Sequence, residues 1–169
     1  MTLEEVSAHL EIQQVLYTYC RGVDRGNAAL ISSIYHEDGR DTHGPWAGLG
    51  SEFGPMLVAE MDKAQIAGQH HITNALIELD GDVANVESYY LAMHPQPDEN
   101  GGADYHVFTG GRYIDKFARR GGVWKIAARV VTIDWSRTSE NTPWEMQQQF
   151  HGGARRERDV SAGHFKTHG

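Results

Sequence analysis

Residues 12–24 read Ile12-Gln-Gln-Val15-Leu16-Tyr-Thr-Tyr19-Cys20-Arg-Gly-Val23-Asp24. Apolar side chains recur here at spacings of three and four, which predicts an amphipathic helix over residues 2–23. Asp24 follows Cys20 by one turn, so its carboxylate points broadly to the apolar side, at a helix end where the dipole disfavours an acid. Asp24 is therefore a candidate functional acid, although the spacing alone fits a surface acid or a turn former equally well.

Two further helices are predicted in the first half of the chain. Gly26 ends the first helix, and Asn27 caps a short second one that runs to Tyr35. Residues 36–50 form a short irregular or extended stretch, after which Ser51 caps a third helix to residue 66.

The second half of the chain predicts long strands, over residues 70–79, 83–94, 105–118 and 123–135. Asp80-Gly81-Asp82 is typical of a hairpin turn, and Gly110-Gly111 indicates a bulge or a sharp bend. Helices followed by long antiparallel strands predict an α+β fold, in which the N-terminal helices pack in a strongly curved, mostly antiparallel sheet.

A C-terminal extension, residues 137–169, follows a single domain of residues 1–136. A short helix is predicted over residues 143–150, and residues 152–169 are rich in Gly, Arg and Ser. We expect this last part to be disordered, or ordered only by a neighbouring subunit. Trp144, Met146 and Phe150 would let the extension act as a lid or as an oligomer contact.

The composition excludes several classes of function. The 169 residues carry a formal net charge of -8, which argues against nucleic acid and anionic membranes as partners. No apolar run approaches the ~20 residues of a membrane-spanning helix. The first residues show no basic region followed by an apolar one, and the single Cys20 excludes an internal disulfide. We therefore expect a cytoplasmic protein.

Ten histidines raise the question of a metal site. Their spacings contain no H-E-x-x-H motif, and adjacent His70 and His71 point to opposite faces of a strand. We expect no metal and no cofactor.

Five segments, in this order, resemble the SnoaL-like branch of the NTF2-like superfamily. They are Arg21-Gly-Val-Asp24-Arg-Gly, Tyr35-His-Glu-Asp38, Gln69-His-His-Ile-Thr-Asn74, Gly111-Arg-Tyr-Ile-Asp115 and Gly122-Val-Trp-Lys-Ile-Ala-Ala-Arg-Val-Val131. The resemblance covers residues 5–136 and implies the cone-shaped α+β barrel of that superfamily. Its members include scytalone dehydratase, hexachlorocyclohexane dehydrochlorinase and bile-acid 7α-dehydratase, and also proteins without catalytic activity.

The resemblance also implies site residues. Members that catalyse eliminations pair an Asp at the foot of the first helix with a His that opens the first long strand, which correspond to Asp24 and His70. Arg129 corresponds to an arginine on the last strand, and Tyr19 to a polar residue five before the acid. Taken without the family, His70 fits a strand histidine, Arg129 an ion-pair partner and Tyr19 a core aromatic. Pocket walls are expected from aromatic and histidine side chains, which are Trp46, His43, Tyr89, His106 and Phe108.

These residues predict a cofactor-independent lyase. Asp24 would orient His70, which would take a proton from an aromatic or polycyclic small molecule with loss of water, halide or formaldehyde. Arg129 and Tyr19 would stabilise negative charge or assist the leaving group. An isomerase or cyclase with the same base is one alternative. A non-catalytic binding protein or oxygenase small subunit is another. We expect a homo-oligomer, a trimer or dimer formed through the outer sheet face.

Overall fold

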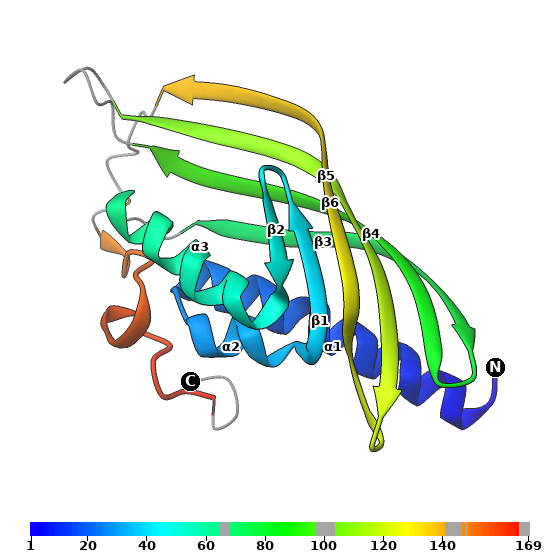
Figure 1. The fold of residues 1–169 in the computed structure, drawn as a ribbon. Helices are drawn as coiled ribbons and strands as arrows, with labels where there is room; N and C mark the ends of the chain where they lie inside the picture. Colours follow the sequence, from blue (N-terminus) through cyan, green and yellow to red (C-terminus); the bar gives the residue numbers. More distant parts are fainter. Residues whose placement is uncertain (65–67, 97–103, 141–146, 148, 166–169) are drawn as a thin grey trace.

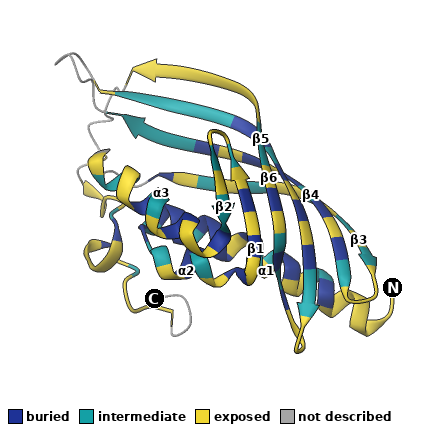
Figure 2. Cartoon of the chain, in the orientation of Figure 1, coloured by how far each residue is buried: buried dark blue, intermediate teal, exposed yellow. Residues whose placement is uncertain are grey.

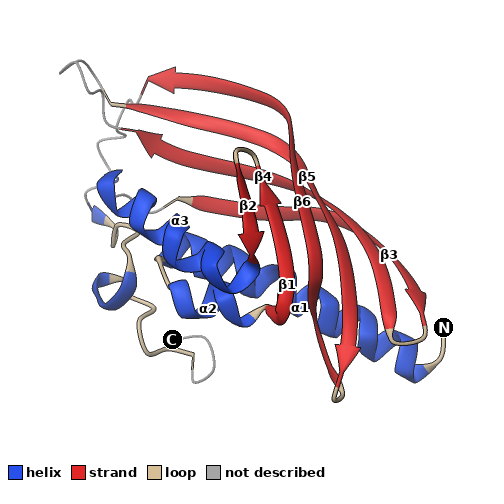
Figure 3. Cartoon of the chain, in the orientation of Figure 1, coloured by secondary structure: helices blue, strands red, loops and turns tan. Residues whose placement is uncertain are grey.

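The computed structural model describes residues 1–64, 68–96, 104–140, 147 and 149–165. Three helices are followed by long strands, apart from a short hairpin between the second and third helices (Figures 1 and 3). The elements are α1 Leu3–Arg25, α2 Ala28–Ser33, β1 Tyr35–His43, β2 Trp46–Leu49, α3 Gly50–Ala64, β3 Gln69–Asp80, β4 Val83–Gln96, β5 Tyr105–Arg120, β6 Val123–Glu140 and a 3-10 turn Arg156–Arg158.

All six strands form one sheet in the order β2-β1-β6-β5-β4-β3. Only β1 and β6 pair in parallel, and every other neighbouring pair is antiparallel. The sheet curves strongly around the helices, which lie on its concave side, and it does not close on itself (Figure 1). The predicted α+β fold is therefore confirmed, as an open cone whose helix-facing side holds the core.

Helix α1 starts beside Thr2, its predicted first residue, and continues two residues beyond its predicted end at Val23, up to the predicted stop at Gly26. Thr2 and Glu5 form a capping box, and Gly26 takes the left-handed conformation at the C-terminus with φ of 67°. The stripe is buried, with Ile12 and Leu16 fully covered (Figure 2). Burying side chains of this kind contributes about 1.5–3 kcal/mol each, which fixes the rotation of α1 and therefore the side on which Asp24 emerges.

The structure corrects one predicted helix end in the first half and decides one open alternative. Helix α2 ends at Ser33 instead of Tyr35, because Tyr35 already begins strand β1. The stretch expected to be irregular or extended is extended, as β1 and β2 form a hairpin whose register pairs His43 with Trp46. The parallel pairing of β1 with β6 gives β1 its place in the sheet, a long-range contact that local sequence does not reveal.

Bulges interrupt the long strands at three points. The register shifts between Ile72 and Asn74 on β3, where Thr73 is the extra residue. It also shifts on β6, once opposite Gly110-Gly111, as predicted, and once opposite residues 116–117. A Cβ on Gly111 would lie 2.0 Å from a backbone oxygen, so this position requires glycine. Each bulge bends its strand and exchanges the inner and outer faces beyond it.

The described part of the C-terminal extension packs against its own chain. Strand β6 continues to Glu140, so the predicted boundary at residue 136 falls inside a strand. Within residues 149–165, Arg155 and Asp159 are buried. Two ion pairs join this segment to α1 and α3, Asp159 with Arg25 and Arg155 with Asp62. A role of the extension as a lid or as an oligomer contact stays a prediction. Trp144, Met146 and most of the helix predicted over 143–150 lie outside the described residues, and Phe150 is exposed.

The convex face of the sheet carries large exposed apolar side chains, which are Leu76, Tyr89, Leu91, Ile114, Val130 and Trp135. Assembly through this face stays a prediction. In the described part of the chain, no helix combines the length and apolar character that crossing a membrane requires.

Candidate functional site

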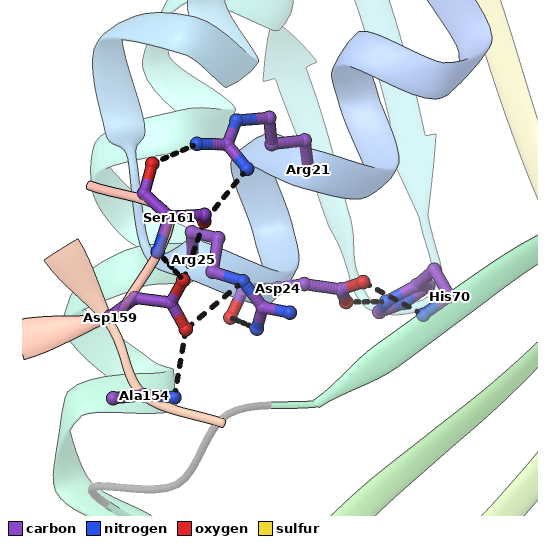
Figure 4. A network of polar contacts seen from close by, with 7 residues as sticks. All are labelled: Arg21, Asp24, Arg25, His70, Ala154, Asp159 and Ser161. Carbon is purple, nitrogen blue, oxygen red and sulfur yellow. Dashed lines mark hydrogen bonds and ion pairs between the residues drawn. The ribbon is translucent and has the colours of Figure 1, made fainter. Parts of the chain in front are cut away.

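The end of α1 and the start of β3 bring Asp24 and His70 together (Figure 4). Asp24 Oδ1 lies 2.7 Å from Nδ1 of His70, and Asp24 Oδ2 accepts a hydrogen bond of 3.0 Å from the backbone N–H of the same residue. Both side chains are largely covered, with 13% of Asp24 and 7% of His70 exposed. The carboxylate thus holds both the ring and the backbone of His70.

The two contacts define the chemical state of the imidazole. An ionised carboxylate only accepts hydrogen bonds, so Nδ1 carries the proton that it donates to Asp24. In the neutral ring the lone pair then lies on Nε2, which has no hydrogen bond to any described residue. His70 therefore has the arrangement of an oriented base.

His94 of β4 lies beside His70, with ring centroids 5.0 Å apart in an edge-on arrangement. Burial lowers the pKa of His94 from 6.5 to about 4, helped by the positive charge that His70 can carry. A neutral ring next to the base can donate or accept a hydrogen bond. His94 is not among the candidate residues that the sequence pattern predicts. The hairpin turn at residues 80–82 could have located His94 near His70 to within one residue. Counting back from the turn puts Met93 opposite His70, whereas the bulge at Thr73 puts Ala92 there.

Arg129 lies deeper on the concave face and is paired with Asp115 of β5. Its Nε and Nη2 each lie 2.7 Å from one carboxylate oxygen, and neither side chain has any exposed surface. Of the interpretations left open, the buried ion pair is the one observed. Ala127 is an extra, bulged residue between Lys125 and Arg129, so these two side chains lie on opposite faces of β6.

Tyr19 connects the two pairs. Its ring lies 6.4 Å from the His70 ring and 5.4 Å from that of Tyr113, both edge-on. The guanidinium of Arg129 lies between the two tyrosines, 4.6 Å from the centroid of Tyr19 and 4.3 Å from that of Tyr113. Burial raises the pKa of Tyr19 well above its usual range, so the phenol keeps its proton.

Two of the five predicted wall residues lie together near the site. His43 stacks on Phe53 of α3 with centroids 4.7 Å apart, and Trp46 packs against the same ring at 5.1 Å. Burial lowers the pKa of His43 from 6.5 to about 4, with further lowering by Arg129, His70 and His94. His43 therefore stays neutral at physiological pH and lies within electrostatic reach of the base.

The other three predicted wall residues lie on the convex face of the sheet, so the prediction that they line the pocket is wrong. Tyr89 is exposed and alternates with Tyr90, which is in the core. Phe108 pairs with Met93 and His106 with Pro95, so both point away from the side of Ala92 and His94. Phe108 contacts Arg137 there, at 5.5 Å. The register of β5 against β4, which is not written locally in the sequence, decides these faces.

Asp41 of β1 was not singled out as a site residue, yet it is buried on the concave face beside Arg129. Tyr35 donates a short hydrogen bond to its Oδ2. Burial raises the pKa of Asp41 from 3.8 to about 6, against the opposing effects of Tyr35 and Arg129. The signal that could have found Asp41 is an acid at alternate spacing with the candidate His43.

Among the residues that the structure describes, no group of three or more His, Cys, Asp or Glu side chains is arranged to hold a metal ion. The expectation that the protein works without a cofactor stays a prediction.

Comparisons with known proteins agree with this geometry at the level of fold. The model of the SnoaL-like domain family matches residues 4–130. The solved structure of hexachlorocyclohexane dehydrochlorinase LinA-type3 from Novosphingobium barchaimii LL02 is 21% identical, with a TM-score of 0.72 over 84% of this chain and 99% of that one. A search of curated proteins finds no match.

Two further solved structures share the fold of this chain. A protein from Novosphingobium aromaticivorans, provisionally described as a scytalone dehydratase, is 20% identical with a TM-score of 0.68 over 92% of this chain and 96% of that one. A variant of Rv3472, a Mycobacterium tuberculosis protein of unknown function, is 24% identical with a TM-score of 0.65 over 78% of this chain and 74% of that one. At these identities the likeness establishes the shared fold alone.

Proposed function

This chain belongs to the SnoaL-like domain family, and on that premise we propose that it is a lyase that uses His70 as a base on an apolar small molecule. The observation that carries the proposal is the double contact of Asp24 with His70, through Nδ1 at 2.7 Å and the backbone N–H at 3.0 Å. It supports a base because it leaves Nε2 unprotonated and without a partner among the described residues.

The chemical step is a base-promoted elimination. Nε2 of His70 takes a proton from a carbon of the substrate, and the electron pair of that C–H bond forms a carbon–carbon double bond. The leaving group departs from the adjacent carbon with the electrons of its own bond. The carboxylate of Asp24 stabilises the resulting imidazolium. Proton transfer to a positioned side chain of this kind typically raises the reaction rate by roughly 10²–10⁴-fold.

The surroundings support an apolar, flat substrate. Tyr19 and the group formed by His43, Trp46 and Phe53 present aromatic surface. We therefore propose an aromatic or polycyclic substrate that loses water or halide in this step. For loss of formaldehyde, Nε2 would instead take the O–H proton of a hydroxymethyl group, the C=O bond would form as the C–C bond breaks, and the electrons left on the substrate carbon would take up a proton. The neutral His94 beside the base can hydrogen-bond a departing oxygen or halide.

Matched substitutions of two adjacent histidines test the proposal. A panel of halogenated cyclohexanes and β-hydroxy aromatic ketones would be assayed for halide or water loss with the wild type, His70→Ala and His71→Ala. His71 is exposed and points away from Asp24, so its loss should leave turnover unchanged, whereas His70→Ala should abolish it. Equal rates for the two variants on any compound that the wild type consumes would refute a base at His70.

An isomerase with the same base is the second candidate, favoured by the same free Nε2. Its proton would return to a different carbon, so the product would keep the formula of the substrate. Turnover in D₂O separates the two: an elimination product lacks the abstracted hydrogen, and an isomerisation product carries deuterium at the new position.

A further inference from the structure

Four side-chain polar atoms on the concave face are buried and have no hydrogen-bond partner among the described residues. Three of them lie on the adjacent strands β1 and β6, and they are Asp41 Oδ1, His43 Nδ1 and Arg129 Nη1, while the fourth is Ser88 Oγ on β4. Asp41 and Arg129 each expose 1% of their surface. An unsatisfied buried group of this kind costs about 1–3 kcal/mol, and native proteins rarely leave several together. Their concentration at one place therefore indicates a site for an external polar group.

Strand pairing brings the three residues together. Asp41 of β1 lies directly opposite Arg129 of β6, and His43 follows two residues later on the same face of β1. Nδ1 of His43 lies 3.8 Å from Oδ1 of Asp41. That distance is too long for a direct hydrogen bond, but one oxygen atom can lie ~2.8 Å from both.

The neighbours hold these atoms in place. Tyr35 donates a hydrogen bond to Oδ2 of Asp41 and so fixes the orientation of the carboxylate, while Oδ1 has no hydrogen-bond partner among the described residues. Asp115 occupies Nε and Nη2 of Arg129 and leaves Nη1. The ring of His43 is fixed by stacking on Phe53 at an interplanar angle of 22°. The site is thus preorganised.

The set of atoms selects one functional group. Asp41 Oδ1 accepts a hydrogen bond and Arg129 Nη1 donates one, while His43 Nδ1 donates in the tautomer that faces a carboxylate. A hydroxyl both donates and accepts, so it satisfies the acid and a donor at once. An ether, a carbonyl or a halide offers no proton to Asp41. We propose that Asp41, His43 and Arg129 form a subsite for a hydroxyl group on an aromatic ring of the ligand.

The aromatic part of this inference comes from Phe53 and Trp46, which flank His43 and give a flat apolar surface next to the subsite. The ring of Tyr19 lies next to both the base and the subsite, with its centroid 6.4 Å from that of His70 and 4.6 Å from the guanidinium of Arg129, which is a span that one small aromatic molecule can cover. This step rests on the proposed function. The subsite would hold the hydroxyl group of a phenol-like substrate, and His70 would take a proton from a carbon other than the one that bears this hydroxyl.

Equilibrium binding tests the subsite without any turnover. The probes are 2-naphthol and 2-methylnaphthalene, which have similar size and differ in the hydroxyl, measured by calorimetry and by the NMR signal of the Trp46 indole N–H. The wild type should bind 2-naphthol at least about tenfold more tightly, as expected of a charged group that hydrogen-bonds a ligand. Equal affinities, or binding of neither probe, would overturn the subsite.

Three variants sharpen the test. Asp41→Asn should lower the affinity for 2-naphthol about tenfold and leave 2-methylnaphthalene unchanged. Asp38→Asn is the matched control, because Asp38 is an exposed acid on the same strand that pairs with Arg120. His43→Phe keeps the stacking on Phe53 but removes Nδ1, so it provides a second reading should Asp41→Asn fold poorly. A preference for 2-naphthol that survives both substitutions would overturn the subsite.

His70→Ala separates this inference from the proposed function. The variant should keep the preference for 2-naphthol, since His70 is not part of the subsite. Lost turnover with the preference retained supports both proposals. No preference in any variant, with turnover still dependent on His70, removes the hydroxyl subsite and leaves the lyase.

Discussion

Asp24 with His70 and Asp115 with Arg129 are two covered acid–base pairs on the same concave face, each with an oxygen and a nitrogen 2.7 Å apart. In the deeper pair both carboxylate oxygens meet two nitrogens of a group that never loses its proton. In the pair at the end of α1, the carboxylate of Asp24 accepts hydrogen bonds from Nδ1 and from the backbone N–H of His70, and Nε2 has no hydrogen-bond partner among the described residues.

The difference fits a structural role for the deeper pair and the proposed catalytic role for the pair at the end of α1. Arg129 cannot accept a proton, so its pair with Asp115 fixes β5 against β6 and sets the electrostatic field of the core. The neutral imidazole of His70 has a lone pair on Nε2, which makes no hydrogen bond to a described residue and can therefore accept a proton. Burial and a short distance therefore do not by themselves identify a catalytic pair. What distinguishes the proposed base is a free nitrogen that can take up a proton, which Nη1 of Arg129, although also unpartnered, cannot do.

The largest effect on stability is expected from Asp115→Asn. The substitution leaves the buried charge of Arg129 without its counter-charge, which should lower the free energy of unfolding by about 3–5 kcal/mol. Urea denaturation measures it. Glu87→Gln, which removes an exposed partner of Arg112 on the neighbouring strand, is the control and should cost less than about 1 kcal/mol. Similar losses in both variants would contradict the structural role of the deeper pair.

Asp24→Asn should act on turnover instead. The carboxylate accepts from two donors of His70, but an amide has only one acceptor oxygen, so one donor must face an NH₂ group. The ring should respond by moving its proton to Nε2, which removes the base and lowers turnover about a hundred- to a thousand-fold. Nitrogen-15 NMR of the histidines reports the tautomer. Unchanged turnover, or a drop without the change of tautomer, would speak against this account.

Asp41 extends the comparison to an acid whose hydrogen-bond partner is neutral. Burial raises its pKa from 3.8 to about 6, so the folded chain keeps a proton that the unfolded chain releases, and this contribution to stability falls as pH rises through that range. His43 and His94 work in the opposite direction. Their pKa values are lowered from 6.5 to about 4, so their contribution rises with pH over that range.

Asp41→Asn removes only the first of these effects. Between pH of about 4 and 6 the free energy of unfolding should then rise with pH more steeply than in the wild type, by up to about 1.4 kcal/mol per pH unit. Urea denaturation across this range measures the slope. Parallel slopes for the two proteins would contradict a raised pKa of Asp41.

The smallest effect is expected at the C-terminal extension. Asp159 lies 3.5 Å from Arg25, which follows Asp24 in the sequence, and it accepts hydrogen bonds from Ala154 and Ser161 (Figure 4). Asp159→Ala should cost about 1 kcal/mol or less, yet expose Arg155 and its neighbours to trypsin. Glu157→Ala serves as the control. Equal cleavage rates in the two variants would show that Asp159 does not hold the segment.

The helix stripe determined α1 by itself, because burial of one face every 3.6 residues fixes both the helix and the side on which Asp24 emerges. The turn at residues 80–82 likewise determined that β3 and β4 pair. Together with the resemblance carried by the five segments, this was enough to predict the fold and the meeting of Asp24 with His70.

Only the tertiary structure decided the faces of the strands and the partners across them. Side chains alternate with a period of two, so one bulged residue, such as Thr73 or Ala127, reverses every position beyond it. His94 was missed and Tyr89, His106 and Phe108 were misplaced for want of strand register. The pairing of Arg129 with Asp115, the position of Asp41 beside it and the docking of Asp159 on α1 are contacts between distant segments. Such contacts depend on how the sheet curves and on which strands become neighbours, and neither is encoded in any local stretch of the chain.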